Sequence, residues 1–240
     1  MSRSVRALPL VALLMMVSSC GGSGHDSSST ADSTPTAAKA AAAAKAINLQ
    51  QSDAPSGFSA ASTHLTAPDV PTAEKQLARC LGIEPFDEGN VVRTFSDDFA
   101  QHGASEVSLY SGVTVTQSSA TASARAEALR SPKAATCLEA FAPVVQSLSG
   151  GGQFGAQMGA PTTVVLHPES GSASAAYGYS ITIDVTFGAT RVPGNLVIMG
   201  AAKKHTGVQL FAISAGAELP SGERDALWGK LLERLGKDAV

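Results

Sequence analysis

The most constraining feature of this chain is a regular alternation of apolar and polar side chains over residues 177–187. Tyr, Ile, Val and Phe occupy the odd positions, and Gly, Ser, Thr and Asp occupy the even ones. Successive side chains of a β-strand point to opposite faces, so the pattern predicts a long strand with one face on a core and one polar face. The fold must therefore be arranged around a sheet that contains this segment.

Short links join this strand to two more. Residues 193–195 (Pro-Gly-Asn) predict a turn, residues 196–202 a second strand, residues 203–207 another turn and residues 208–214 a third strand. Strands connected by tight turns are antiparallel neighbours. Earlier strands are expected at three further places, namely within residues 47–64, at 91–95 and at 107–117.

Helices are predicted from capping residues and apolar spacing at four places, namely residues 72–81, 119–130, 132–148 and 221–235. The last helix has an apolar stripe made by Leu227, Trp228, Leu231, Leu232 and Leu235. We expect the sheet aromatics to line the space between the sheet and this helix, together with its tryptophan: Tyr177, Tyr179, Phe187, Phe211 and Trp228. This order of elements predicts an α+β fold, an antiparallel sheet with helices packed mainly on one face.

The first twenty residues have the composition of an export signal. Arg3 and Arg6 precede an apolar run of about 11 residues, which is too short to span a bilayer, and small residues lead to Cys20. Val17-Ser18-Ser19-Cys20 resembles the lipobox of bacterial lipoproteins, and this resemblance implies diacylglycerol on the sulfur of Cys20 and cleavage before it. Residues 1–19 are thus expected to be a signal peptide, and the mature chain to be held on the outer face of the plasma membrane.

Residues 20–46 are expected to be a disordered spacer. They are rich in Gly, Ser, Thr, Asp, Ala and Lys and contain no aromatic residue, so they bury too little apolar surface to offset chain entropy. Within this segment, residues 37–46 are nearly all Ala and have some helical propensity. Residues 47–240 are then long enough for a single extracytoplasmic domain with a substantial core.

Three cysteines are present, so lipidation of Cys20 would leave Cys80 and Cys137. Export would place them where disulfides persist, and no neighbouring His or Cys gives them metal-ligand spacing. We therefore expect a Cys80–Cys137 disulfide, with two separate buried thiols as the alternative.

Several short segments resemble those of actinobacterial exported lipoproteins. Asp53-Ala54-Pro55-Ser56-Gly57-Phe58 resembles their opening strand, and residues 78–82 and 131–138 resemble helices that carry their paired cysteines. Related layouts occur in the extracellular sensor domains of receptor kinases and in PsbP-like lipoproteins. The resemblance implies a curved antiparallel sheet flanked by helices, and it carries over no catalytic residue.

Two segments are candidates for binding. Residues 149–161 are glycine-rich, and Gly150, Gly151, Gly152, Phe154 and Gly155 make a loop suited to covering a binding groove. This loop formally matches a dinucleotide fingerprint, but the required preceding strand is not predicted. Lys203, Lys204 and His205 form a small basic turn suited to anionic headgroups or cell-wall polymer, or simply an ordinary charged turn.

The sequence contains no motif for the commonest chemistries. The five histidines lack metal-ligand spacing, no nucleophile-elbow motif is present, and the net charge of −3 argues against nucleic-acid binding. We expect neither a metal nor a cofactor. The sequence thus favours a non-catalytic module that binds or senses an envelope ligand or protein. A lipid or small-molecule carrier with an apolar cavity and an envelope hydrolase are the alternatives.

Overall fold

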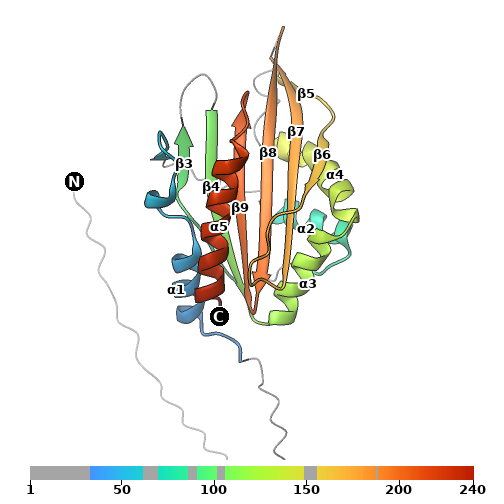
Figure 1. Ribbon diagram of the computed structural model, residues 1–240. Helices are drawn as coiled ribbons and strands as arrows, with labels where there is room; N and C mark the ends of the chain where they lie inside the picture. The colour runs from blue at the N-terminus through green and yellow to red at the C-terminus, as the bar shows by residue number, and fades with distance from the viewer. Residues whose placement is uncertain (1–32, 62–69, 86–90, 102–105, 149–155, 188) are drawn as a thin grey trace, which may run out of the picture. The chain divides into compact units, whose positions relative to one another are not determined.

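A computed structural model describes residues 33–61, 70–85, 91–101, 106–148, 156–187 and 189–240, and the elements follow these residues in order (Figure 1). The helices are α1 (Ala37–Ile47), α2 (Val70–Leu81), α3 (Ser119–Arg130), α4 (Lys133–Leu148) and α5 (Ser221–Asp238), with a 3-10 turn at Gln51–Asp53. The strands are β1 (Ser59–Ala61), β2 (Val91–Phe95), β3 (Asp98–Gln101), β4 (Glu106–Thr116), β5 (Ala156–Met158), β6 (Thr162–Leu166), β7 (Ala175–Phe187), β8 (Thr190–Lys203) and β9 (Thr206–Ala215).

All described strands belong to one antiparallel sheet, which is curved and open (Figure 1). Its order is β1-β3-β4-β9-β8-β7-β5, with β2 added beside β4 and β6 added beside β7. The three long strands β7, β8 and β9 are consecutive antiparallel neighbours, as the alternation and turns predict. The α+β class and the curved antiparallel sheet are therefore confirmed.

One turn lies earlier than expected. Phe187 of β7 pairs with Thr190, so β8 has already begun before Pro193, which lies inside the strand opposite Asp184. Proline is tolerated there because β9 ends at Ala215, opposite Gly194, so no strand among the described residues needs a donor from Pro193. The carbonyl of Pro193 still accepts a hydrogen bond from the Gly216 N–H at 2.8 Å.

One face of the sheet packs against α1 and α5 (Figure 1). The predicted stripe of α5 is entirely buried, and Leu231 is completely inaccessible. It meets alternate residues of the central strands, among them Leu109, Met199 and Leu210. The opposite face packs against α3 and α4, through Ala126, Leu129 and Leu138 among others. Helices thus cover both faces, which corrects the expectation that they lie mainly on one.

The expected spacer boundary is also corrected. Residues 37–46 form most of α1, in which Ala40, Ala43 and Ala44 are buried together with Ile47. Thr36 caps the helix by accepting a hydrogen bond from the Lys39 N–H, and the lysines point to solvent. The folded domain therefore begins at least ten residues before residue 47, because small alanine side chains let α1 pack closely on the sheet and on α5.

The aromatic residues divide between the two faces. Trp228 lies between the sheet and α5 as expected, but Tyr177 and Tyr179 belong to the core on the α3 side. Phe211 alternates with Leu210 and Ala212, which face α5, so its ring lies on the other face, where it stacks on Tyr110 with ring centroids 4.7 Å apart. Only Trp228 therefore fulfils the expectation among the described side chains.

Gly200 allows the ring of Tyr177 to lie flat across β8. A Cβ atom at Gly200 would stand 2.2 Å from Cζ of that ring, which is buried and cannot swing into solvent. We expect Gly200→Ala to lower the free energy of unfolding by about 1–3 kcal/mol, because the overpacked ring must shift. Urea denaturation measures this loss.

The matched control is Gly229→Ala in the exposed part of α5, where an added Cβ meets nothing within 4 Å. There alanine should stabilise the helix by up to about 1 kcal/mol. Equal effects of the two substitutions would contradict the role assigned to Gly200.

Candidate binding site at the β7 edge

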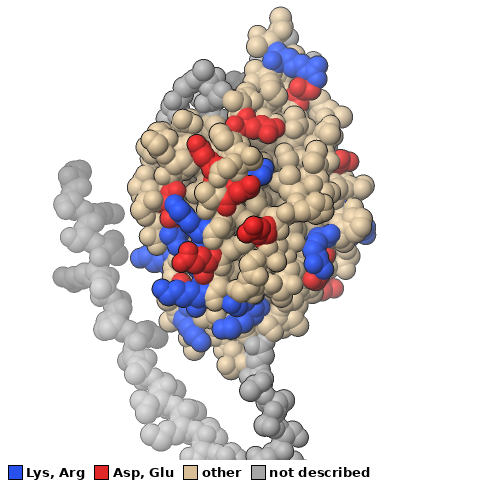
Figure 2. All heavy atoms as spheres, in the orientation of Figure 1, with Lys and Arg blue, Asp and Glu red and all other residues tan. Residues whose placement is uncertain are grey.

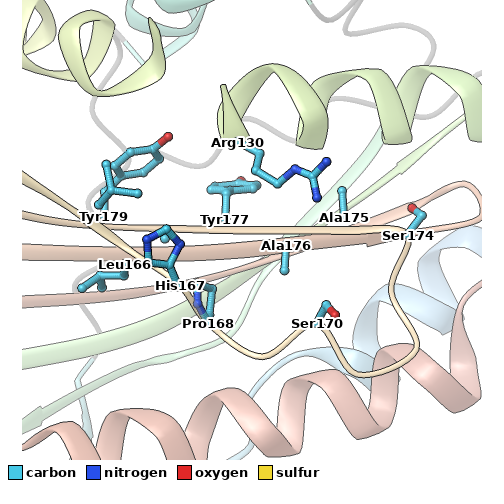
Figure 3. A pocket seen from close by; sticks show the side chains of 12 residues that line it. Arg130, Leu166, His167, Pro168, Ser170, Ser174, Ala175, Ala176, Tyr177 and Tyr179 are labelled. Carbon is cyan, nitrogen blue, oxygen red and sulfur yellow. The ribbon is translucent and has the colours of Figure 1, made fainter. Parts of the chain in front are cut away.

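A hollow of the described surface lies where β6 separates from β7 (Figure 3). β6 pairs with β7 from Thr162, opposite Thr182, to Leu166, opposite Gly178. Two residues later Pro168 packs on Gly178, where a Cβ atom would meet the proline ring at 3.1 Å. Proline has no N–H to continue a ladder, so the chain leaves the sheet edge at this point.

The departing chain is fixed to the α5 side. Trp228 donates its indole N–H to the carbonyl of Glu169 at 2.9 Å, and Lys203 donates to the hydroxyl of Ser172 at 2.9 Å. Gly171 has a φ of 53°, a left-handed conformation that suits glycine at this bend. The bend is thus held away from the strand it has left.

This separation produces a pocket of about 290 Å³ along β7. Its described lining comes from the end of α3, the β6–β7 connection and the edge of β7: Arg130, Val165, Leu166, His167, Pro168, Ser170 and Ser174–Tyr179. Figure 3 shows Arg130 above the strand, on the α3 side, and Ser170 below it, near α5. The pocket therefore opens on both sides of a strand edge.

The polar groups of this pocket differ in how far they are already engaged. Burial raises the pKa of Tyr177 to about 12, and its hydroxyl accepts a hydrogen bond from Gln209 at 2.7 Å, so the phenol stays neutral at physiological pH. The Tyr179 hydroxyl donates to the carbonyl of Leu129, and the Ser174 hydroxyl donates to the carbonyl of Ala202. These groups hold the walls in place and are poorly suited to act as acids or bases.

Among the residues that line the pocket, Arg130 and His167 have basic side chains that face solvent. Arg130 is 57 % exposed and pairs with Glu127 at 2.7 Å, one turn back on α3. A guanidinium has five N–H donors, so one carboxylate leaves others available. His167, on the connection between β6 and β7, is also exposed and lines the same pocket. The arrangement can bind a polar, acidic segment laid along the strand.

The basic turn is placed differently from the expectation of a free surface patch. Lys203, Lys204 and His205 join β8 to β9, but His205 is only 2 % exposed, and its backbone N–H donates to the carbonyl of Val240. The lysines donate to the carbonyls of Gly236 and Ala239 at 2.8 and 3.0 Å, which satisfies acceptors at the end of α5. The turn thus anchors the C-terminal helix. On the face drawn in Figure 2, acidic and basic side chains are interspersed.

The expected disulfide is present. Cys80 on α2 and Cys137 on α4 are bonded, with their Cα atoms 5.7 Å apart. Cys20 and the loop residues Gly150, Gly151, Gly152, Phe154 and Gly155 lie outside the described residues. The pocket does not follow from the predicted elements because these do not include β6, although Thr162-Thr163-Val164-Val165 is a β-branched run ahead of a proline.

Metal-ligand clusters and membrane-spanning helices are two features that would define the type of site. Within the part of the chain that the structure describes, no three His, Cys, Asp or Glu side chains gather as metal ligands would. The helices of this same part include none with the length and apolarity needed to cross a membrane. No model of a known protein family matches the chain, and neither does any curated protein.

Proposed function

We propose that this chain is an exported lipoprotein, anchored through diacylglycerol on Cys20 to the outer face of the plasma membrane, whose domain binds an envelope ligand or protein without catalysis. The observation that supports it most is the Cys80–Cys137 bridge. Structural disulfides persist in oxidising compartments and are rare in the cytosol. A disulfide-bonded domain that follows a lipobox-like segment is consistent with a location on the outer face of the plasma membrane.

A binding role is supported by the construction of the β7 pocket. The hydroxyls of Tyr177, Tyr179 and Ser174 are held in internal hydrogen bonds, whereas Arg130 is exposed and the strand edge lines the pocket. Such a site is suited to recognition, since its polar groups are prearranged and its accessible charge sits at the rim. The carrier alternative requires an apolar cavity, and this pocket is lined by polar groups and strand backbone as well as apolar side chains.

Anchoring is tested by the Cys20→Ser variant. We expect the wild-type chain, expressed in a bacterial host that processes lipoproteins, to incorporate a labelled fatty acid and to begin at residue 20 with the added mass of lipid. Cys20→Ser should incorporate no label and keep its first residues, because serine lacks the thiol that is acylated. Intact-mass analysis distinguishes these forms.

Ser23→Ala, three residues further on, is the control and should behave as wild type. An unlabelled wild-type chain that retains Met1 would refute the proposed anchoring.

A further inference from the structure

The edge of β7 inside the pocket has backbone groups that receive no hydrogen bond from the described residues. The direction of these groups follows from β6. Thr163 donates its N–H to the Glu139 carboxylate at 3.3 Å, away from β7, so Thr163 and Ile181 form a non-hydrogen-bonded pair. In an antiparallel ladder the two kinds of pair alternate, so Gly178 and Ser180 direct their N–H and C=O groups outward, toward β6.

Ala176 follows the same alternation. It lies two residues before Gly178, so its N–H and C=O also point to the outer edge. The carbonyl of Asp184, another even-numbered residue, accepts from the Gly159 N–H at this edge, which agrees with that assignment. Extending the register of β6 would place Pro168 opposite Ala176, and proline cannot donate. No hydrogen bond from the described residues reaches Ala176 at this edge.

The surroundings of Ala176 define what can occupy the edge. β7 begins at Ala175, and its pairing with β6 begins only at Gly178. Residues 175–177 therefore form about 10 Å of strand edge that β6 does not cover. A segment paired there would direct alternate side chains toward the α3 side, where Arg130 stands, and toward the bend at residues 168–173 (Figure 3). The exposed guanidinium favours a carboxylate on the first of these sides.

We propose that the β7 edge at Ala176 binds an extended peptide segment of a partner protein by strand addition, with an Asp or Glu side chain of that segment held by Arg130. This inference rests on the proposed binding function and names its ligand class. Main-chain hydrogen bonds to Ala176 supply affinity, and Arg130 supplies selectivity for an acidic residue.

The test uses the complete lipidated chain in detergent micelles and an array of end-capped, fluorescent heptapeptides. Their three central positions are varied over Val, Thr, Ser, Ala and Glu, and each Glu peptide has a Gln counterpart. We expect Glu peptides to bind at least fivefold more tightly than their Gln counterparts, measured by fluorescence anisotropy. Arg130→Gln should remove this preference, whereas Arg191→Gln, at an exposed position on β8 far along the strand, should keep it.

The main-chain hydrogen bonds at Ala176 are tested by one change in the protein and one change in the peptide. Ala176→Pro removes the outward N–H and leaves the ladder to β8 intact, so it should weaken binding at least tenfold. A peptide N-methylated at the residue that faces β7 should lose binding equally, while methylation one residue further on should be tolerated; this arm leaves the protein unchanged.

Three results would overturn the proposal. They are the absence of any binding peptide, equal binding by both N-methyl isomers, and a concentration-dependent wild-type dimer that Ala176→Pro abolishes, which would assign the edge to a second copy. A chain that is lipidated at Cys20 yet binds no array peptide would refute strand addition alone and leave the anchoring intact.

Discussion

The Cys80→Ala/Cys137→Ala double variant should lose about 2–4 kcal/mol of free energy of unfolding. The bridge joins residues 57 positions apart, and the loop it closes contains β2, β3, β4 and α3. Cutting it frees the unfolded chain over that whole segment, and it also releases α2 from α4. Urea denaturation of the oxidised chain from residue 21 to residue 240 measures the loss.

Reductant provides the control for this prediction. It should lower the unfolding midpoint of the wild type to that of the double variant, and it should leave the double variant unchanged. The single variant Cys80→Ala should be about as unstable as the double variant, because either substitution removes the same bond. A wild-type midpoint that does not respond to reductant would show that the bridge does not contribute to stability.

The central sheet and the last helix were predictable because periodicity reports directly on burial. The alternation over residues 177–187 fits only one regular secondary structure, a β-strand. The stripe from Leu227 to Leu235 has the spacing of one helix face. Which face of the sheet each helix covers depends on long-range packing, which no local pattern encodes. Tyr177 was therefore assigned to the correct strand but to the wrong side.

α1 was missed for a different reason. Its buried face consists mainly of alanine, and its exposed face is also largely alanine, so the sequence has little contrast between them. Composition alone then resembles a spacer. What fixes residues 37–47 is their fit against α5 and β4, which is a property of the assembled domain.

The pocket depends on a register that the sequence does not reveal. Pro168 comes to lie opposite Ala176, where it cannot donate a hydrogen bond, only because Leu166 pairs with Gly178. A shift of β6 by one residue would instead bring Pro168 opposite Ala175 or Tyr177, whose backbone groups face β8. In the same way, the turn at Lys203 was predictable, but the burial of His205 was not, since it requires the C-terminus to pack beside it.

Asp53→Asn should cost about 2 kcal/mol of free energy of unfolding at pH 7. The Asp53 side chain is 6 % exposed and receives two hydrogen bonds from Arg234, at 2.7 and 2.9 Å, and one from the Gln50 N–H at 2.7 Å. Arg234 also donates to the carbonyl of Asn48, so this group ties the segment after α1 to α5 (Figure 1). An amide would replace a charged acceptor with a neutral one and leave Arg234 poorly matched.

The matched control is Asp225→Asn on α5, the helix that carries Arg234. Asp225 is 60 % exposed and pairs with Arg224, its neighbour in sequence, so its loss should change stability by at most about 0.5 kcal/mol. If the two substitutions have equal effects in thermal or urea denaturation, the assigned role of Asp53 is wrong.

The pH dependence of the stability difference between wild type and Asp53→Asn shows how much of it comes from the charge of Asp53. Burial alone would raise the pKa of Asp53, but the hydrogen bonds from Arg234 and Gln50 and the charges of Arg234 and Lys230 outweigh it and hold the pKa below its usual 3.8. A carboxyl whose pKa is lower in the folded state stabilises the fold above its unfolded pKa and loses that contribution as pH falls through the folded one. The stability gap between wild type and Asp53→Asn should therefore be constant from pH 7 to about pH 5 and narrow below about pH 4. A gap that widens on acidification would mean that Asp53 is stabilised in its protonated form, which is incompatible with two guanidinium hydrogen bonds to its carboxylate.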